Sequence, residues 1–145
     1  MFELGTDGPS LILAAVDGSD TSLRAGAYAA GLARRQGSRV ICLFVAQMPV
    51  LSGTAALAAG AALENVEAIA ADLKKQIETN AARLGIPVEF VVRRGEPFAQ
   101  IAKLADERRA DAVVVGASGH AGRRLVGSIA SRLVRTARWP VIVVP

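Results

Sequence analysis

The chain has 145 residues, of which 52% are hydrophobic, 21% are charged and only 4% are aromatic. That length fits one domain with a full core, and the composition excludes a disordered chain, so residues 1–145 are expected to form a single domain. One cysteine, Cys42, excludes an internal disulfide, and one histidine, His120, excludes a metal site built on paired histidines. Because no apolar run approaches 18 residues and Met1–Leu4 lacks the form of a signal peptide, we expect no membrane span and a cytoplasmic location.

The net charge of +4 is concentrated near the end of the sequence. From Ala112 to Pro145 the chain carries five arginines and no acidic residue, while the remainder is close to neutral. Three of these arginines recur at a spacing of three, which is typical of a solvated helix face. Nucleic-acid binding is not expected, because aromatic residues that would stack on bases are scarce. The five are Arg123, Arg124, Arg132, Arg135 and Arg138.

Short apolar runs alternate with segments of helical periodicity along the chain. Continuous apolar runs are typical of strands buried on both faces, and strands joined by crossover helices form a parallel sheet covered by helices on both sides. The fold class is therefore α/β. The least regular stretch, Ala46 to Gly60, is expected to be a long loop that is either mobile or functional. The expected strands are residues 11–16, 39–45, 88–93, 112–115 and 141–144. The expected helices are residues 20–36, 61–84 and 128–138, with a further helix that opens at Pro97 and has Ile101 to Ala105 on its inner face.

Two segments lie at the carboxyl ends of expected strands, where open α/β sheets bind their ligands. They are Ala15–Ser19 and the stretch Gly116–Ser128, which contains four glycines. Glycines allow successive amides to approach a phosphate, and the next helix begins at Gly127–Ser128 with free N–H groups. The alternative is a flexible glycine loop with an ordinary serine cap. Neither the Walker P-loop nor the Rossmann glycine pattern fits, and Ser118 with His120 is a poor nucleophile pair.

Several separated segments together resemble the universal stress protein family, and the likeness covers almost the whole chain. They are Val16–Ser19, Val91–Pro97, Asp111–Gly116 with the glycine loop behind it, Gly127–Ser128 and residues 140–144. The resemblance implies a Rossmann-like fold of the adenine nucleotide alpha hydrolase type. Its open five-stranded parallel sheet would have the strand order 3-2-1-4-5, with helices on both faces.

ATP-binding members of that family carry the pattern Gly-x2-Gly-x9-Gly-Ser/Thr. This sequence has Gly116-x2-Gly119, followed by only seven residues before Gly127 and Ser128. By resemblance, these four residues would hold the phosphates and the ribose. The spacer is two residues shorter than the family pattern, which keeps open the second class of members, those that bind no nucleotide.

The same resemblance implies that Ala15 and Asp17 lie near the adenine and that Val45 lines the base pocket. Asp17 would accept a hydrogen bond from the adenine amino group, although a carboxylate before a helix is also a common cap or turn former. Arg123 and Arg124 lie inside the short loop, where their guanidinium groups either pair with phosphate oxygens or point to solvent.

Three functions are compared. The first is an adenine-nucleotide-binding stress protein, with ATP as the leading ligand, with or without Mg²⁺, and with AMP or a cyclic nucleotide still open. The second is an interaction module of the same fold that binds no nucleotide. The third is an enzyme of a related α/β fold that uses bound ATP, and the lack of a P-loop lysine and of acidic residues for magnesium in the glycine loop counts against it. Slow hydrolysis at most is expected, because no general base with a placed partner is evident. The apolar edge strand Val141–Val144 predicts a homodimer, since such edges pair with another chain, and in the family they pair across a two-fold axis.

Overall fold

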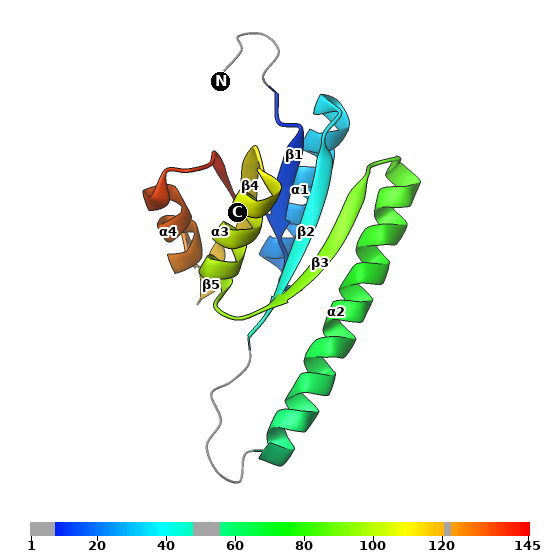
Figure 1. Cartoon of the computed structure of the whole chain (residues 1–145), viewed down its shortest axis with the longest axis vertical. Helices are drawn as coiled ribbons and strands as arrows, with labels where there is room; N and C mark the ends of the chain where they lie inside the picture. The colour runs from blue at the N-terminus through cyan, green and yellow to red at the C-terminus, as the bar shows by residue number, and fades with distance from the viewer. Residues whose placement is uncertain (1–7, 48–55, 121–122) are drawn as a thin grey trace.

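The computed structural model describes residues 8–47, 56–120 and 123–145. Within them, strands and helices alternate along the chain, as the apolar runs predict (Figure 1). The strands of the main sheet are β1 (Leu11–Ala15), β2 (Arg39–Ala46), β3 (Val88–Arg94), β4 (Ala112–Gly116) and β7 (Val141–Val144), and the helices are α1 (Asp20–Gln36), α2 (Ala56–Leu84), α3 (Pro97–Arg108) and α4 (Ser128–Thr136).

The five main strands are parallel and lie in the order β3-β2-β1-β4-β7. With the strands of a separate small hairpin left out of the numbering, this is the predicted order 3-2-1-4-5. Strand β1 lies in the centre, between β2 and β4, and the two edges are β3 and β7. The order reverses between β1 and β4, so the carboxyl ends of these two strands form the switch point at which ligands bind to such sheets.

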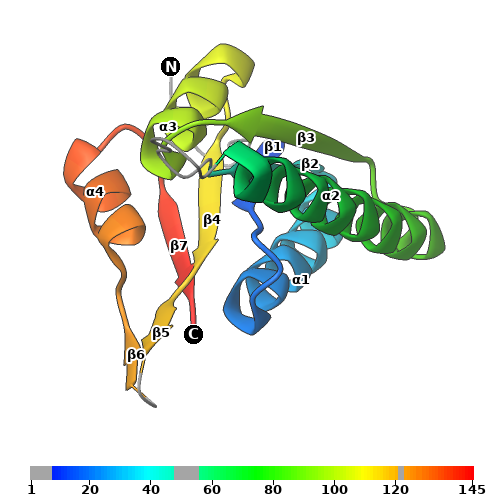
Figure 2. The same ribbon diagram turned by 90° about the horizontal axis from the view of Figure 1, so that it is seen from below.

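Side chains alternate between the two faces of the sheet, which divides the core in two. Figure 2 shows α3 and α4 on one face and α1 and α2 on the other. Leu13 and Ile12, neighbours on β1, are both fully buried but belong to opposite halves. Cys42 lies in the α1 half, where burial raises the pKa of its thiol to about 11, so it packs as a small hydrophobe, as predicted.

The helix ends follow local sequence signals. Ser19 caps α1, its side chain accepting from the N–H of Ser22, and Gly37 ends that helix with a left-handed φ of 68°. Pro97 opens α3 behind the cap residue Glu96. None of the helices in the described part of the chain is long and apolar enough to cross a membrane.

Two expectations need correction. Helix α2 begins at Ala56, so the expected loop of residues 46–60 is in part helical, and its residues 48–55 lie outside the described ranges. The glycine loop contains a hairpin, in which β5 (Ser118–His120) pairs antiparallel with β6 (Arg123–Leu125). The two segments are separated by two residues in the sequence, the spacing of the tightest hairpins. Short antiparallel pairing therefore competes with the open loop that glycines alone suggest.

Gly116 ends β4 at a place where the backbone of α1 lies close to the sheet. A Cβ at this position would lie 2.6 Å from the carbonyl carbon of Thr21 and 2.8 Å from the nitrogen of Ser22, and both atoms belong to the backbone. Only a residue without a side chain allows this approach. The start of α1 therefore lies directly over the carboxyl end of β4.

Gly116→Ala is expected to lower the free energy of unfolding by about 1–3 kcal/mol, because overpacking against backbone atoms cannot be relieved by rotating a side chain. Urea unfolding followed by circular dichroism measures this change. The control is Gly31→Ala in α1, where an added Cβ meets open space and alanine favours the helix by about 1 kcal/mol. A Gly116→Ala midpoint equal to that of wild type would contradict the close approach.

Candidate functional site

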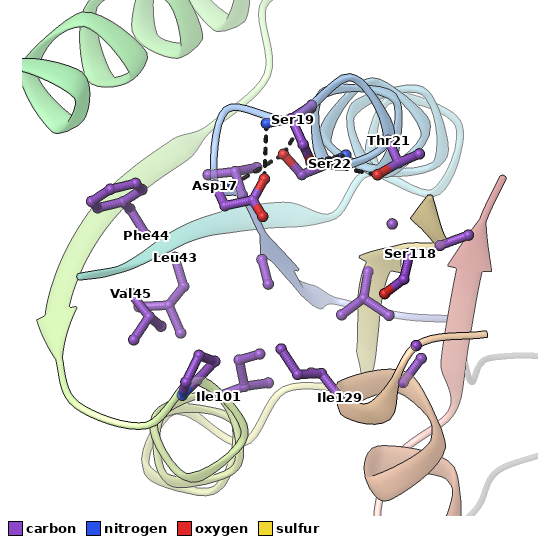
Figure 3. A pocket seen from close by; sticks show the side chains of 18 of the residues that line it. Asp17, Ser19, Thr21, Ser22, Leu43, Phe44, Val45, Ile101, Ser118 and Ile129 are labelled. Carbon is purple, nitrogen blue, oxygen red and sulfur yellow. Dashed lines mark hydrogen bonds between the residues drawn. The ribbon is translucent and has the colours of Figure 1, made fainter. Parts of the chain in front are cut away.

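A cavity of about 920 Å³ opens at the carboxyl end of the sheet. Its walls come from the ends of β1, β2 and β4 and from the first turns of α1, α3 and α4 (Figure 3). This is the predicted position, because the switch between β1 and β4 separates the crossover helices and leaves a crevice. The volume lies within the range of about 300–1,000 Å³ that is usual for small-molecule sites.

One side of the cavity is apolar. Leu43 and Val45 contribute from β2, Ile101 from α3 and Ile129 from α4, and Figure 3 shows these side chains gathered around the same space. Val45 and Ile129 are only partly covered by the core, so they offer surface to a ligand. A flat, apolar group such as a heteroaromatic ring fits a wall of this composition.

The opposite side is a turn of hydroxyl and carboxyl groups between β1 and α1. Asp17 Oδ1 accepts from the backbone N–H of Ser19 at 2.8 Å, and the Asp17 N–H donates to Ser22 Oγ at 3.1 Å. The Ser22 hydroxyl in turn donates to the Ser19 carbonyl at 3.0 Å. Asp17 thus forms the turn that was one of its two expected roles, while its carboxylate remains exposed on the cavity wall.

The Asp17 carboxylate is held in its ionised form by these contacts. Burial raises the pKa of Asp17, but the hydrogen bonds from Ser19 and Ser22 together outweigh it and place the pKa below its ordinary value. At neutral pH the carboxylate is therefore ionised and can only accept hydrogen bonds. A ligand group that meets it must donate a hydrogen bond, as an amino group does.

Three helices point their N-termini at the cavity, and they are capped differently. Ser19 caps α1 through its side chain, and Glu96 caps α3 by accepting from the N–H groups of Phe98 and Ala99. Helix α4 has Gly127 at its cap position and no side-chain hydrogen bond there. Gly127, Ile129 and Ala130 all line the cavity. The first amides of α4 are thus left for a ligand, and a helix N-terminus favours an anion by about 0.3–1 kcal/mol.

Gly127 also marks a close contact with Ser118. A Cβ at Gly127 would lie 2.0 Å from Ser118 Oγ and 3.0 Å from Ser118 Cβ. The Ser118 hydroxyl therefore occupies the space beside the cap where a longer residue would place its side chain, and it lines the cavity (Figure 3). This brings a hydroxyl donor next to the free amides of α4.

Charged side chains on the cavity wall do not favour an anion by themselves. In the described part of the lining, Asp17 and Asp20 stand together with one arginine, Arg24, whose Nε donates to the Asp20 carbonyl at 3.4 Å. Among these described groups, the amides at the start of α4 add a further source of positive potential. Within the described residues, no group of three or more His, Cys, Asp or Glu side chains is arranged to hold a metal ion.

The structure brings five of the nine predicted residues into one cavity lining: Ala15, Asp17, Val45, Gly116 and Gly127. Ser128 follows Gly127 as the first residue of α4. The other three lie in the β5–β6 hairpin, which extends beyond the carboxyl end of β4 (Figure 2). There the backbone of Gly119 pairs with that of Arg124, and Arg123 pairs with His120.

Sequence reasoning missed the residues that reach the cavity from helices far along the chain. Ile101 and Ile129 carry no motif of their own and appear in the sequence as ordinary core residues. The sequence pattern presents Ser118 only as a poor nucleophile candidate. The signal that points to its place in the cavity is its position between Gly116 and Gly119, inside the predicted binding loop.

A comparison with known proteins now decides the family. The model of the universal stress protein family matches residues 10–145. The chain belongs to this family. A universal stress protein of Methanocaldococcus jannaschii is 29% identical to it over 136 residues, which cover 92% of this chain and 80% of that protein.

Solved structures agree with this assignment. The universal stress protein UspA from Lactobacillus plantarum has a TM-score of 0.78 and 26% identity, with coverage of 94% of this chain and 97% of that one. A universal stress protein solved in complex with cAMP has a TM-score of 0.71 and 27% identity, with coverage of 96% and 99%. The family and the fold predicted from the sequence are both confirmed.

The lowered pKa of Asp17 predicts how this universal stress protein responds to acid. A carboxylate with a depressed folded pKa stabilises the protein fully above its unfolded pKa, and this stabilisation is lost as the pH falls through the folded value. Asp17→Asn is expected to be less stable than wild type at pH 7, with a difference that shrinks below about pH 4. Thermal unfolding of both proteins between these pH values measures the difference in their stability. A difference that does not change with pH would contradict the role of the Asp17 charge.

Proposed function

We propose that this universal stress protein binds an adenine nucleotide, with ATP as the leading ligand, and uses it as a regulatory ligand in a cytoplasmic stress response. One observation carries the proposal: the N-terminus of α4, whose cap residue Gly127 makes no side-chain hydrogen bond, opens into a cavity that also has an apolar wall. An anion and a flat ring at opposite ends of one ligand match these two surfaces. The relative in complex with cAMP supports the same ligand class.

In the proposed complex, the adenine lies against Val45 and beside Ala15. The carboxylate of Asp17 accepts a hydrogen bond from the adenine amino group, which suits a group that is only an acceptor at neutral pH. Gly116 leaves room for the ribose, because no side chain projects from the end of β4.

The phosphates then lie at the start of α4, at Gly127 and Ser128. Gly119, Arg123 and Arg124 complete the phosphate site from the hairpin. Because Asp17 and Asp20 lie on the cavity wall, a Mg²⁺ ion bound to the phosphates would reduce repulsion from the carboxylates. Mass spectrometry of ligand released from the denatured protein separates ATP from AMP and from a cyclic nucleotide.

Regulation rather than catalysis is proposed for the bound nucleotide. Proton transfer needs a base that is free to accept a proton and is held in place by a partner. In the described lining, Asp17 is already engaged by the turn before α1, and its depressed pKa makes it a weak base. Slow hydrolysis at most is therefore expected.

A second function rests on a different observation, the pairing of the glycine loop. Residues 118–120 pair with residues 123–125 instead of remaining an open loop, which removes backbone groups from any phosphate contact. This favours an interaction module that binds no nucleotide and acts as a dimer. The two functions predict different results with ATP. A nucleotide-binding protein is stabilised against unfolding by ATP, whereas the interaction module is not.

Thermal unfolding with ATP and Mg²⁺ tests the nucleotide. At a ligand concentration 100 times the Kd, binding adds about 2.7 kcal/mol, which is roughly 5–10 °C in Tm for a domain of this size. Gly127→Val is expected to abolish the shift, because its side chain would displace the Ser118 hydroxyl and cover the first amides of α4. Gly31→Val, in open space on α1, is the control that keeps the shift.

Ser118→Ala adds no bulk and is expected to reduce the shift only in part. A wild-type protein that shows no shift and releases no nucleotide on denaturation would remove the first function and leave the interaction module.

The edge strand β7 carries the proposed homodimer. Two bonds show which residues of β7 face β4: the Val113 N–H donates to the Pro140 carbonyl, and the Ala117 N–H donates to the Val144 carbonyl. Because successive residues of a strand point their backbone groups to opposite sides, those of Val141 and Val143 point away from β4. These groups are available to a second copy of the chain.

Light scattering at micromolar concentration is expected to give the mass of two chains. Val143→Pro removes one outward N–H and should shift the protein towards the monomer, while Ile142→Pro removes a ladder bond to β4 and should lower Tm instead. A monomeric wild-type mass would contradict the dimer.

A further inference from the structure

Arg132 links the two helices that border the cavity opposite the Asp17 turn. Its Nη1 donates to Glu96 Oε1 at 2.8 Å, and its guanidinium carbon lies 4.1 Å from the centroid of the Phe98 ring. Arg132 belongs to the second turn of α4, whereas Glu96 and Phe98 form the start of α3. The side chain thus bridges the helices close to the cavity without being part of its lining.

The carboxylate of Glu96 accepts hydrogen bonds from both helices, α3 and α4. Oε1 accepts from the N–H of Phe98 at 3.2 Å and Oε2 from that of Ala99 at 2.8 Å, while Oε1 also accepts from Arg132. Burial raises the pKa of Glu96, but the backbone bonds and the bond from Arg132 outweigh it and leave the pKa below its ordinary value. The carboxylate therefore stays charged at neutral pH and keeps all three contacts.

The same segment is tied to the strand that carries the apolar wall. The Gly95 N–H donates to the carbonyl of Ala46, the last residue of β2, at 3.2 Å. Gly95 has a φ of 135°, a conformation that favours glycine, and it lets the chain turn from β3 into the cap of α3. A continuous chain of contacts consequently runs from Val45 on β2, through Glu96, to Arg132 on α4.

We propose that Arg132 is a positioning residue: it fixes the free N-terminus of α4 at the distance from the apolar wall that a phosphate-bearing ligand requires. This inference rests on the proposed function. Ala130 and Leu133 already hold α4 in the core, with relative exposures of 2% and 0%. A half-exposed ion pair adds only about 0–1 kcal/mol to stability. The contribution of Arg132 is therefore to the orientation of α4 more than to folding.

The ligand test compares ATP with adenosine by isothermal titration calorimetry. Arg132→Ala is expected to weaken ATP binding about threefold to tenfold, because amides at a helix N-terminus lose most of their effect on an anion once they are misplaced. Adenosine has no phosphate and should bind as it does to wild type. The control is Arg135→Ala, which removes the same charge from an exposed position on the same helix.

Equal losses for ATP and adenosine would overturn the proposal, because they would indicate general loosening of the cavity. An Arg135→Ala loss equal to that of Arg132→Ala would overturn it too, because net charge alone would then explain the effect.

A second measurement needs no ligand. The amide of Ser131, which donates to the Gly127 carbonyl at 3.0 Å, is expected to exchange with deuterium at least about threefold faster in Arg132→Ala than in wild type. Arg135→Ala should leave it unchanged. Unchanged exchange in Arg132→Ala would overturn the positioning role, whichever ligands bind. Faster exchange in a protein that binds no adenine nucleotide would support it and refute the proposed function alone.

Discussion

The approach of α1 to the end of β4 is the constraint on which the cavity depends. A Cβ at Gly116 would lie within 3 Å of three backbone atoms of Thr21 and Ser22. Because the side chain is missing, the Asp17 turn and the first residues of α1 lie over the switch point between β1 and β4, and they form the polar side of the site. If α1 moved outward, the hydrogen bonds between Asp17, Ser19 and Ser22 would face solvent instead of the Ile101 wall.

A second organising feature is the difference in capping between the N-termini of α1, α3 and α4. The caps of α1 and α3 satisfy amides with side chains that come just before each helix. At α4 the cap is glycine, and the Ser118 hydroxyl lies beside it from another segment. Leaving amides unbonded costs stability, so a site that keeps them free is typically reserved for a ligand. In the described lining, Arg24 stands against Asp17 and Asp20, so the backbone amides of α4 are an important source of attraction for an anion.

Sequence patterns predict strands and their ends better than they predict contacts between elements that lie far apart in the chain. Apolar runs identified the five main strands, one of which, β3, is interrupted by the polar Glu89, and the strand ends located Ala15, Asp17 and Val45 at one edge of the sheet. Ile101 and Ile129 could not be found this way, because they reach the cavity only through the packing of α3 and α4. The hairpin at residues 118–125 was missed for a related reason. Glycine content indicates that a loop is permissive, whereas pairing of Gly119 with Arg124 depends on register across a turn.

Cys42 gives the molecule a property that concerns its chemistry under oxidation. The chain has no other cysteine, and this one is 4% exposed, with burial raising the pKa of its thiol to about 11. Oxidants and alkylating agents react with the thiolate, so the folded protein presents almost no reactive sulfur to them. Oxidants are therefore expected to leave the Cys42 thiol of the folded protein unmodified, and labelling of this thiol would report molecules that have unfolded.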